Sequence, residues 1–526
     1  MTASRLLERF LAQDPDRIAV TAPDGTAWSF AGLLARAGNL TRLLQRAGGC
    51  EGRTVLLRTA GGPLFAACDL AVLFAGAVPA VVPEHLTAGQ ARAVLRSLRP
   101  AAVLDTLSGH DDQVVEAART AGIPVHPVTA EDLDAQLPPR ASSLRKQARR
   151  WAGARSSTAA AVVFTSGTTG APRGVVVTDR ALTDGITAWM RHWPSAARRP
   201  ERTVASLPVS HIAQRIMGHS LMCLYGTTVH TAGPDDLTGA IVRHRPDVLL
   251  GVPHTLTRLA HALTAEEEAG GAELRTAVGG IALAVNGAAA LAPATARTLT
   301  AAGLRVAGAY GATETTVPVY HQPDTTAPHL GIPVTAAHRV GDGGELLIRS
   351  PHLSPGYVTR WPRTRPVTTG GWWHTGDRAT ETRDGQIVLA GRLSAAFKTA
   401  RGRLVSPEPF EAFLTARPGV DHACVTGHQL PHTVALVSAP GTAHWPPDRV
   451  RGLERDLLAA VARAQKSGAL PWADLHTVLV LPDPWAGTGL VTATGKPRRD
   501  KITDRYAHLL PHPTPDVTAE ERHARA

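Results

Sequence analysis

The stretch that most constrains the fold lies at residues 162–182, VVFTSGTTGAPRGVVVTDRAL. An apolar, β-branched run leads into six residues that are all Thr, Ser or Gly, and a second β-branched run, Val175 to Val177, follows after Ala-Pro-Arg-Gly. β-branched residues favour strands, and glycines remove side-chain clashes from a turn. The pattern therefore predicts two strands joined by a flexible loop.

The loop has the composition of an anion-binding site. Backbone N–H groups can turn inward around an anion where glycines leave space, while four hydroxyl side chains and one arginine add donors and positive charge. It has neither the Lys-Ser/Thr pair of the Walker motif nor the GxGxxG of dinucleotide-binding folds. The alternative is a plain hairpin loop rich in Ser, Thr and Gly. We expect phosphate binding by Thr165, Ser166, Gly167, Thr168, Thr169, Gly170 and Arg173.

The segment TSGTTGAPRG, residues 165–174, resembles the phosphate-binding signature of the adenylate-forming superfamily: acyl-CoA synthetases, aryl-acid ligases, luciferases and peptide-synthetase adenylation domains. The other motifs of this chain, described below, most resemble those of long-chain fatty acyl-CoA synthetases. In that family the basic residue is usually Lys, so Arg173 keeps the charge but replaces a point donor with a planar fork. The resemblance implies an α/β protein with a large N-terminal layered α/β region and a small, mobile α+β C-terminal domain joined by a hinge.

The length of the chain also predicts more than one domain. A chain of 526 residues exceeds what one hydrophobic core usually supports. We expect a large ATP- and acid-binding domain at residues 1–390 and a small domain with the catalytic lysine at residues 391–510. Residues 511–526 are polar and rich in proline, and we expect a disordered tail there.

Composition argues against secretion, a membrane span and nucleic-acid binding. No early segment resembles a secretory signal, and the apolar stretch at residues 65–82 carries Asp69 and Pro79, which suits a buried helix and strand. The net charge of +11 is spread over the chain, and its densest run, residues 145–155, fits a solvated linker. The four cysteines lack metal-ligand or disulfide spacing. We therefore expect a reduced, cytoplasmic protein.

Three further motifs imply a nucleotide site through the same resemblance. GAYGATETT, residues 308–316, resembles the family's YGxTE element, and WWHTGDR, residues 372–378, resembles its TGD element. The turn at residues 286–289 is similar to the one against which adenine lies, because small residues allow a flat base to approach. We expect Gly287, Ala288, Ala289 and Gly311 to belong to the nucleotide site.

The resemblance assigns roles to four side chains of these motifs. Tyr310 would stack on adenine, and Thr313 would contact the α-phosphate. Glu314 would serve Mg²⁺, because a carboxylate beside phosphates can hold this ion directly or through water. Asp377 would bind both ribose hydroxyls.

The acid site is implied by ASLPVSHIAQRIMGH, residues 205–219. It resembles the LPLSHIAER segment of long-chain synthetases, which lines the acid pocket, so His211 and Gln214 are candidate substrate-binding residues. A histidine that is buried for structural reasons is the alternative interpretation of His211.

The hinge and the catalytic lysine lie in the last third of the chain. Residues 389–411, LAGRLSAAFKTARGRLVSPEPFE, resemble the family's hinge segment, in which Arg392 would contact the nucleotide and Ser394 replaces the usual charged hinge residue. GLVTATGKPRRDKI, residues 489–502, resembles the terminal element that carries a catalytic lysine. We expect Lys496, Thr313, Glu314 and Arg392 to be the catalytic residues.

The resemblance implies an AMP-forming ligase that uses ATP and Mg²⁺, releases pyrophosphate and makes an acyl- or aryl-adenylate. A small-molecule acid would be its substrate, and CoA, a separate carrier protein or an amine would accept the acyl group. One alternative is a natural-product ligase of the same fold that forms an amide or activates nitrite for diazotisation of an aryl amine. The other is a nucleotide-binding scaffold without turnover. The sequence does not identify the acid.

Overall fold

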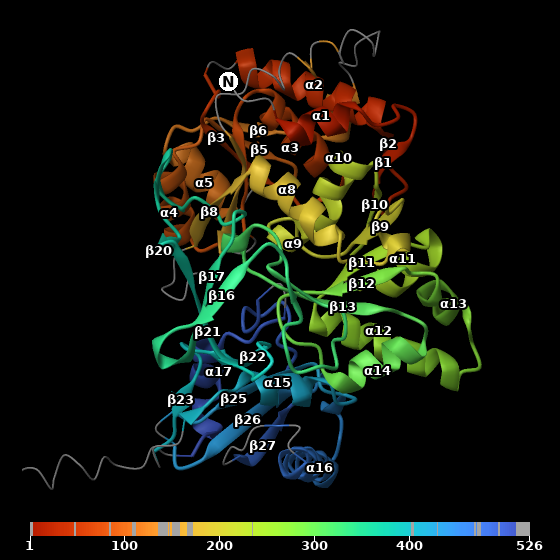
Figure 1. The fold of residues 1–526 in the computed structure, drawn as a ribbon, viewed down its shortest axis with the longest axis vertical. Helices are drawn as coiled ribbons and strands as arrows, with labels where there is room; N and C mark the ends of the chain where they lie inside the picture. The colour runs from red at the N-terminus through yellow and green to blue at the C-terminus, as the bar shows by residue number, and fades with distance from the viewer. Residues whose placement is uncertain are drawn as a thin grey trace, which may run out of the picture.

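The computed structural model describes residues 4–46, 49–83, 86–107, 112–134, 146, 148–149, 158–165, 172–233, 235–400, 404–428, 430–467, 470, 475–492 and 495–511. Figure 1 shows a larger body, formed by the red-to-green part of the chain, above a smaller body in cyan and blue. This confirms the predicted α/β fold with a large N-terminal region and a small C-terminal domain.

One sheet of the larger body contains the two strands predicted around the Ser/Thr/Gly loop. Its order is β19-β18-β8-β7-β4-β3-β5-β6. The strands are β3 (Thr54–Arg58), β4 (Val78–Val81), β5 (Ala102–Asp105), β6 (Val125–Pro127), β7 (Ala159–Thr165), β8 (Arg173–Thr178), β18 (Tyr357–Arg360) and β19 (Arg363–Arg365). Strands β7 and β8 pair antiparallel, with Thr165 opposite Arg173. The tip of the loop, Ser166 to Gly170, lies outside the described residues.

The central strands of this sheet are buried because helices cover the sheet. Strands β4 and β5 consist of buried residues throughout, as parallel strands covered on both faces do. Thr87 and Gln90 form a capping box that starts α4. The helices of this part are α1 (Arg5–Leu11), α2 (Phe30–Arg46), α3 (Gly62–Phe74), α4 (Ala88–Leu98), α5 (Gln113–Thr120), α6 (Ala130–Asp134) and α8 (Asp179–Met190).

The second large sheet has the order β15-β14-β13-β12-β11-β9-β10-β1-β2. Its strands are β1 (Ile18–Thr21), β2 (Ala27–Ser29), β9 (Arg202–Ala205), β10 (Thr228–Thr231), β11 (Val248–Gly251), β12 (Leu283–Asn286), β13 (Val306–Tyr310), β14 (Tyr320–Gln322) and β15 (Ile332–Pro333). Its helices are α9 (Ile212–Gln214), a π-helical segment (Arg215–Ser220), α10 (Leu221–Tyr225), α11 (Leu237–His244), α12 (Pro253–Glu268), α13 (Glu273–Gly279) and α14 (Pro293–Ala301).

A third sheet leads from the larger body to the smaller one. It contains β16 (Ala337–Val340), β17 (Glu345–Arg349), β20 (Thr368–Thr369), β21 (Trp372–Glu381) and β22 (Ile387–Arg392). The smaller body contains β23 (Phe397–Lys398), β24 (Leu404–Val405), α15 (Glu408–Thr415), β25 (His422–Thr426), β26 (Thr433–Ser438), α16 (Pro447–Lys466), β27 (Leu475–Leu481) and α17 (Arg499–Arg505). The expected disordered tail lies outside the described residues, apart from its first residue.

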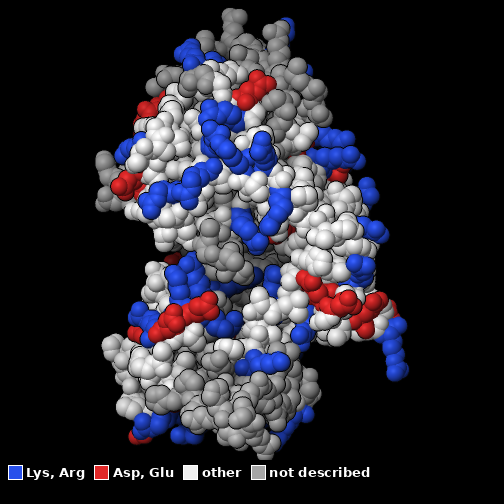
Figure 2. All heavy atoms as spheres, turned by 90° about the vertical axis from the view of Figure 1, so that its left-hand side faces the viewer, with Lys and Arg blue, Asp and Glu red and all other residues white. Residues whose placement is uncertain are grey.

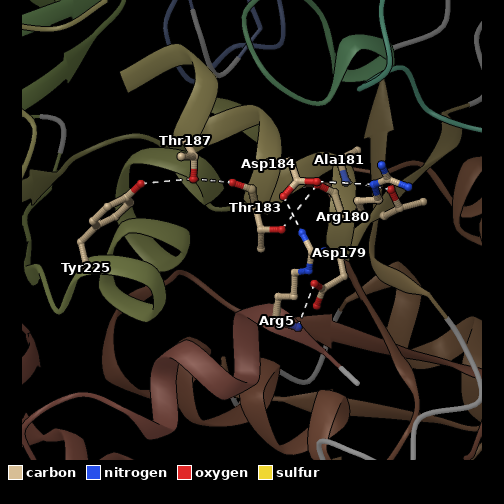
Figure 3. Close-up of polar contacts among 9 residues, drawn as sticks. Arg5, Asp179, Arg180, Ala181, Thr183, Asp184, Thr187 and Tyr225 are labelled. Carbon is tan, nitrogen blue, oxygen red and sulfur yellow. Dashed lines mark hydrogen bonds and ion pairs between the residues drawn. The ribbon is translucent and has the colours of Figure 1, made fainter. Parts of the chain in front are cut away.

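Asp179 fastens the first helix of the chain to the larger body. Its carboxylate accepts hydrogen bonds from the Ser4 hydroxyl and from the Arg5 backbone N–H, the latter at 3.1 Å. Figure 3 shows the Asp179 contact with the Arg5 backbone and, beside it, the ion pair between Arg5 and Asp184, at 2.7 Å. Asp179 stands where the resembling family tends to have His, and here it binds Ser4, the residue that caps α1, and the N–H of the first helical residue.

Among the residues that the structure places, no helix combines the length and the apolar character that crossing a bilayer requires.

Candidate active site

The expected site residues gather at one edge of the second sheet. Strands β9 to β13 pair in parallel, so their carboxyl ends meet at the same edge. The segments that carry His211, Gly287 and Tyr310 leave the sheet there. In open sheets of parallel strands, ligands bind outside the carboxyl ends of the strands.

The turn after β12 presents a nearly bare backbone at this edge. Ala288 has a left-handed backbone, with φ of 71°, and the Asn286 side-chain amide donates to the Ala289 carbonyl at 2.9 Å. Ala288 and Ala289 are exposed, whereas Gly287 is buried. The Asn286 bond holds a strained turn that would give a flat ligand close access. The sequence indicates the small residues but not the left-handed alanine.

Tyr310, Asp377 and Arg392 form one linked group. The Tyr310 hydroxyl donates to Asp377 Oδ2 at 2.6 Å, and Arg392 Nε lies 2.8 Å from Asp377 Oδ1. The third sheet creates this arrangement, because Asp377 on β21 pairs directly with Arg392 on β22. The sequence resemblance implies that Tyr310, Asp377 and Arg392 lie near the nucleotide, but it does not predict the hydrogen bond from Tyr310 to Asp377.

Burial sets the protonation of this group. It raises the pKa of Asp377, and Arg392 and the Tyr310 hydroxyl oppose that rise. Burial and then the charge of Asp377 raise the pKa of Tyr310 well above its ordinary value, so the hydroxyl keeps its proton and donates. Asp377 is therefore a carboxylate that two donors hold in place.

Glu314 is held by a tyrosine that the sequence analysis missed. It is buried in a short turn after β13, and the Tyr357 hydroxyl donates to its Oε1 at 2.8 Å. The guanidinium of Arg173 lies 5.0 Å from the centre of the Tyr357 ring. Burial and then Glu314 raise the pKa of Tyr357 to about 12. Tyr357 stands outside the resembling motifs, so no local signal identifies it.

One glycine and two threonines complete the phosphate side. A Cβ on Gly311 would lie 3.0 Å from Thr315 Oγ1 and 3.1 Å from Pro318 Cα, so a side chain there would require the turn to shift by a few tenths of an ångström. Thr313 lies two residues on, in the turn that carries Glu314. The Thr165 hydroxyl oxygen is buried and has no hydrogen-bond partner within the described part of the chain. An orphaned hydroxyl at the start of the loop fits a phosphate oxygen.

Lys496 reaches this group from the smaller body. Its turn is closed by hydrogen bonds from the Lys496 N–H to Thr492 Oγ1, at 3.0 Å, and from the Thr492 N–H to the Lys496 carbonyl, at 2.9 Å. Burial lowers the pKa of Lys496 and Arg392 lowers it further, while Asp377 and Glu408 oppose the decrease. Solvent still reaches the side chain, as it does at the mouth of a cleft.

His211 and Gln214 lie in different surroundings. His211 precedes α9, and burial and then the charge of Lys496 lower its pKa, which places the two residues near each other. Gln214 is buried, and its Oε1 accepts the Leu207 N–H at 3.2 Å. Gln214 also lines a small cavity of about 30 Å³. His211 therefore lies within range of the Lys496 charge, and Gln214 lines a cavity that His211 does not line.

A buried charged cluster supports the acid segment. Arg215 and His219 contact the Asp69 carboxylate of α3, with Arg215 Nη1 2.8 Å from Oδ1 and His219 Nε2 2.9 Å from Oδ2. All three side chains are fully buried. His219 lines the same cavity as Gln214, together with Phe65 of α3.

The carboxylates present fit Mg²⁺ bound through a nucleotide. Nowhere in the described ranges do three His, Cys, Asp or Glu side chains gather as a metal cage. Mg²⁺ is usually bound by one or two carboxylates together with substrate phosphates. Glu314 is a single fixed carboxylate on the phosphate side, which suits such an ion.

Basic side chains border the site from outside. Figure 2 shows Lys and Arg gathered over the larger body and around the hollow between the two bodies. Exposed Arg360, Arg363 and Arg365 lie on β18 and β19, in the sheet that also carries Arg173. Such a surface attracts anionic ligands at low ionic strength.

Comparison with known proteins gives matches over most of the chain. The profile of a family described as AMP-binding enzyme matches residues 7–358. Long-chain-fatty-acid–CoA ligase FadD15 of Mycobacterium bovis is 26% identical over 515 residues, covering 84% of this chain and 85% of that protein. Sulfoacetate–CoA ligase of Cupriavidus necator is 27% identical over 449 residues, covering 81% and 85%.

A similar fold occurs among solved structures. The crystal structure of ATP-bound MatB from Rhodopseudomonas palustris superposes with a TM-score of 0.74 at 22% identity. It covers 97% of this chain and 100% of that chain. At this identity the likeness shows the fold alone.

Proposed function

The chain belongs to the AMP-binding enzyme family, and we propose that it activates a carboxylic acid with ATP through Lys496 and then transfers the acyl group to CoA. The family predicted from the sequence motifs is thereby confirmed. The proposal is supported by the position of Lys496, which is near enough to Asp377, Arg392 and His211 for their charges to interact.

The chemistry requires positive charge at the α-phosphate. A carboxylate is a poor electrophile, because its leaving group would be oxide, whereas its adenylate expels AMP. As the carboxylate oxygen attacks the α-phosphate, negative charge gathers on the phosphoryl oxygens, and fixed cations and donors stabilise it. Lys496 would bridge the acid and the α-phosphate, and Thr313 would donate to the same phosphate. Holding the acid and the nucleotide in line contributes further.

The remaining residues bind the nucleotide. Asp377 would accept the ribose hydroxyls, with Arg392 and Tyr310 fixing its orientation. Thr165 and Arg173 would contact the departing pyrophosphate. Mg²⁺ would neutralise phosphate charge when bound, and Glu314 would hold it. We place the small domain at residues 391–510 and its hinge at Ser394.

CoA is the acceptor that the sequence relatives favour, since both relatives described above are CoA ligases. A carrier protein or an amine as acceptor, and nitrite as the activated acid, are the alternatives from the sequence analysis. The position of His211 near Lys496 suits the carboxylate of an organic acid, because a neutral histidine can donate to it.

The test is ATP-dependent pyrophosphate release across fatty acids, aryl acids, amino acids and nitrite, each with and without CoA. We expect turnover with at least one carboxylic acid, a thioester product with CoA, and a loss of at least about 10²-fold in Lys496→Ala. Lys501→Ala is the matched control, because this exposed lysine lies five residues further on. Turnover with nitrite alone would replace carboxylate activation, and ATP binding without any turnover would indicate a scaffold.

A further inference from the structure

Two histidines join the larger body to the smaller one beside the catalytic lysine. His254 lies in the first turn of α12, and His422 begins β25. Their rings stack with centroids 5.1 Å apart and an angle of 17° between the planes. The backbone of Asp421 also forms a hydrogen bond with His254. One side chain of the larger body thus makes two contacts with one strand end of the smaller body.

The stack touches the turn that presents Lys496. A Cβ added to Gly495 would lie 3.4 Å from His254 Cβ and 3.7 Å from His422 Nε2. Gly495 has a left-handed backbone, with φ of 75°, which favours glycine in the turn. A Cβ at this position would make ordinary van der Waals contact with both rings, so the residue that precedes Lys496 lies next to the stack.

The surroundings of the pair favour two neutral rings. His422 is buried and its other face packs on Trp485, with ring centroids 6.3 Å apart. His254 lies at the positive end of α12, where a second positive charge is disfavoured.

The charged groups around the pair act in both directions. Arg258 on α12 lowers the pKa of His254, while Asp421 and Asp235 raise it, and burial outweighs both carboxylates. Asp235 is largely engaged by Arg258, at 2.9 Å. Lys496 follows Gly495 and adds positive charge on the active-site side. Burial and then His254 lower the pKa of His422 to about 4.

We propose that His254 and His422 are positioning residues that latch the smaller body onto the larger one and seat Lys496 for adenylation, and that acid pH opens this latch. This inference rests on the proposed function for its kinetic readout, but not for its structural one. When the two bodies separate, the rings lose their stack and meet water, and either ring can then bind a proton at its ordinary pKa.

The direction of the pH effect follows from the difference in histidine pKa between the latched and the open arrangement. The pKa of both rings is lower in the latched arrangement, so latching requires neutral rings and releases any bound proton. The latch is complete above the ordinary histidine pKa of about 6.5 and is lost as the pH falls toward 4. The rate of adenylation should fall as the pH decreases over that range. The rate of acyl transfer from preformed adenylate to CoA should not show this fall.

Phenylalanine separates stacking from titration. His422→Phe keeps a ring on His254 and Trp485 but cannot bind a proton, so only His254 is left to titrate and adenylation should fall less at pH 5.5 than in the unmodified protein. His254→Ala and His422→Ala remove the stack and should lower adenylation about tenfold at pH 7.5, with thioester formation from preformed adenylate changed less than about twofold. His476→Ala is the matched control, because His476 stacks on His432 at the same 5.1 Å centroid distance within the smaller body.

A distance measurement tests the latch without any acid substrate. Nitroxide labels on Glu268→Cys of α12 and Asp456→Cys of α16 report the separation of the two bodies, and all four native cysteines are buried. We expect one distance at pH 7.5 and a second, longer distance at pH 5.5. His422→Phe should reduce the share of the longer distance at pH 5.5, the alanine variants should show that distance at pH 7.5, and His476→Ala should behave as the unmodified protein.

The two proposals fail in different ways. A silent pyrophosphate assay would overturn the proposed function and leave the distance measurement to judge the latch. Distances that stay the same at both pH values and in both alanine variants would overturn the latch even if adenylation proceeds. If His422→Phe does not fold, His254→Phe tests the same point from the larger body.

Discussion

At the scale of single residues, Asp377 is the proposed ribose-binding residue. Burial raises its pKa, and two neighbours, Arg392 and Tyr310, oppose that rise. The hydrogen bond from Tyr310 uses the hydroxyl end of the ring. Under the proposed function, the same tyrosine would fix the ribose-binding carboxylate and stack its ring on adenine.

Removal of this hydroxyl should move the pH dependence of ATP use. In Tyr310→Phe, Asp377 loses a donor that lowers its pKa, so its pKa rises further and protonation starts at higher pH. We expect the acid limb of kcat/KM for ATP to move upward in pH, with a loss of about tenfold at neutral pH. Tyr320→Phe is the control, since the Tyr320 hydroxyl has no hydrogen-bond partner in the part of the chain that is described. A profile unchanged in both variants would contradict this role of Tyr310.

Arg215 offers a second prediction at this scale. It neutralises the Asp69 carboxylate in the core, where an unpaired charge is strongly unfavourable. Arg215→Met leaves only His219 to pair with Asp69, so we expect the free energy of unfolding to fall by about 3–5 kcal/mol in urea titrations. Arg243→Met, which breaks the exposed pair with Asp236, should change it by less than about 1 kcal/mol. Equal effects in the two variants would show that the buried pair contributes no more to the free energy of unfolding than the exposed pair does.

At the scale of elements, the sequence predicts the strands well, but it does not predict the hydrogen bonds that connect helix α1 to the rest of the larger body. The β-branched runs on either side of the Ser/Thr/Gly loop become β7 and β8, because such residues pack well in a buried sheet. Asp179, in contrast, gives no local signal, since its partners Ser4 and Arg5 lie at the other end of the domain in sequence. Contacts between distant segments depend on the assembled fold.

Loss of Asp179 should weaken the attachment of α1. Asp179→Ala removes the acceptor of two hydrogen bonds at the start of α1, and a buried donor left without its partner costs about 1–3 kcal/mol. We expect a corresponding drop in thermal stability and faster hydrogen exchange in residues 5–11. Asp184→Ala breaks only the exposed ion pairs with Arg5 and Arg180, and it should change stability by less than about 0.5 kcal/mol. Unchanged exchange in the Asp179 variant would show that α1 is held by its apolar face alone.

At the scale of the whole molecule, the site is assembled from motifs that the sequence shows and from residues that it hides. Thr313, Glu314, Asp377, Arg392 and Lys496 were identified because each stands in a motif with a recognisable wording. Tyr357 and the pair His254 and His422 stand outside those motifs or depart from them, and they enter only when β18, α12 and β25 come together. Their roles depend on which surfaces face each other, and short motifs do not encode that.

The two bodies also have separate hydrophobic cores. The clusters of the smaller body contain only residues from Phe397 onward, and those of the larger body contain none beyond Ile387 among their fully buried members. Domains with separate cores can unfold as separate units. We therefore expect two transitions in calorimetry, of which saturating ATP raises the one of the larger body most, since a ligand stabilises the unit that binds it.

A core substitution can assign the two transitions. Phe410 is buried in the smaller body, so Phe410→Ala should cost about 3–5 kcal/mol there and lower one transition only. Phe74→Ala, in the core of the larger body, should lower the other. Because Lys496 belongs to the smaller body, the Phe410 variant should lose adenylation on heating while nucleotide binding by the larger body persists. A single transition that both substitutions shift equally would mean that the contacts across the hinge make the molecule one cooperative unit.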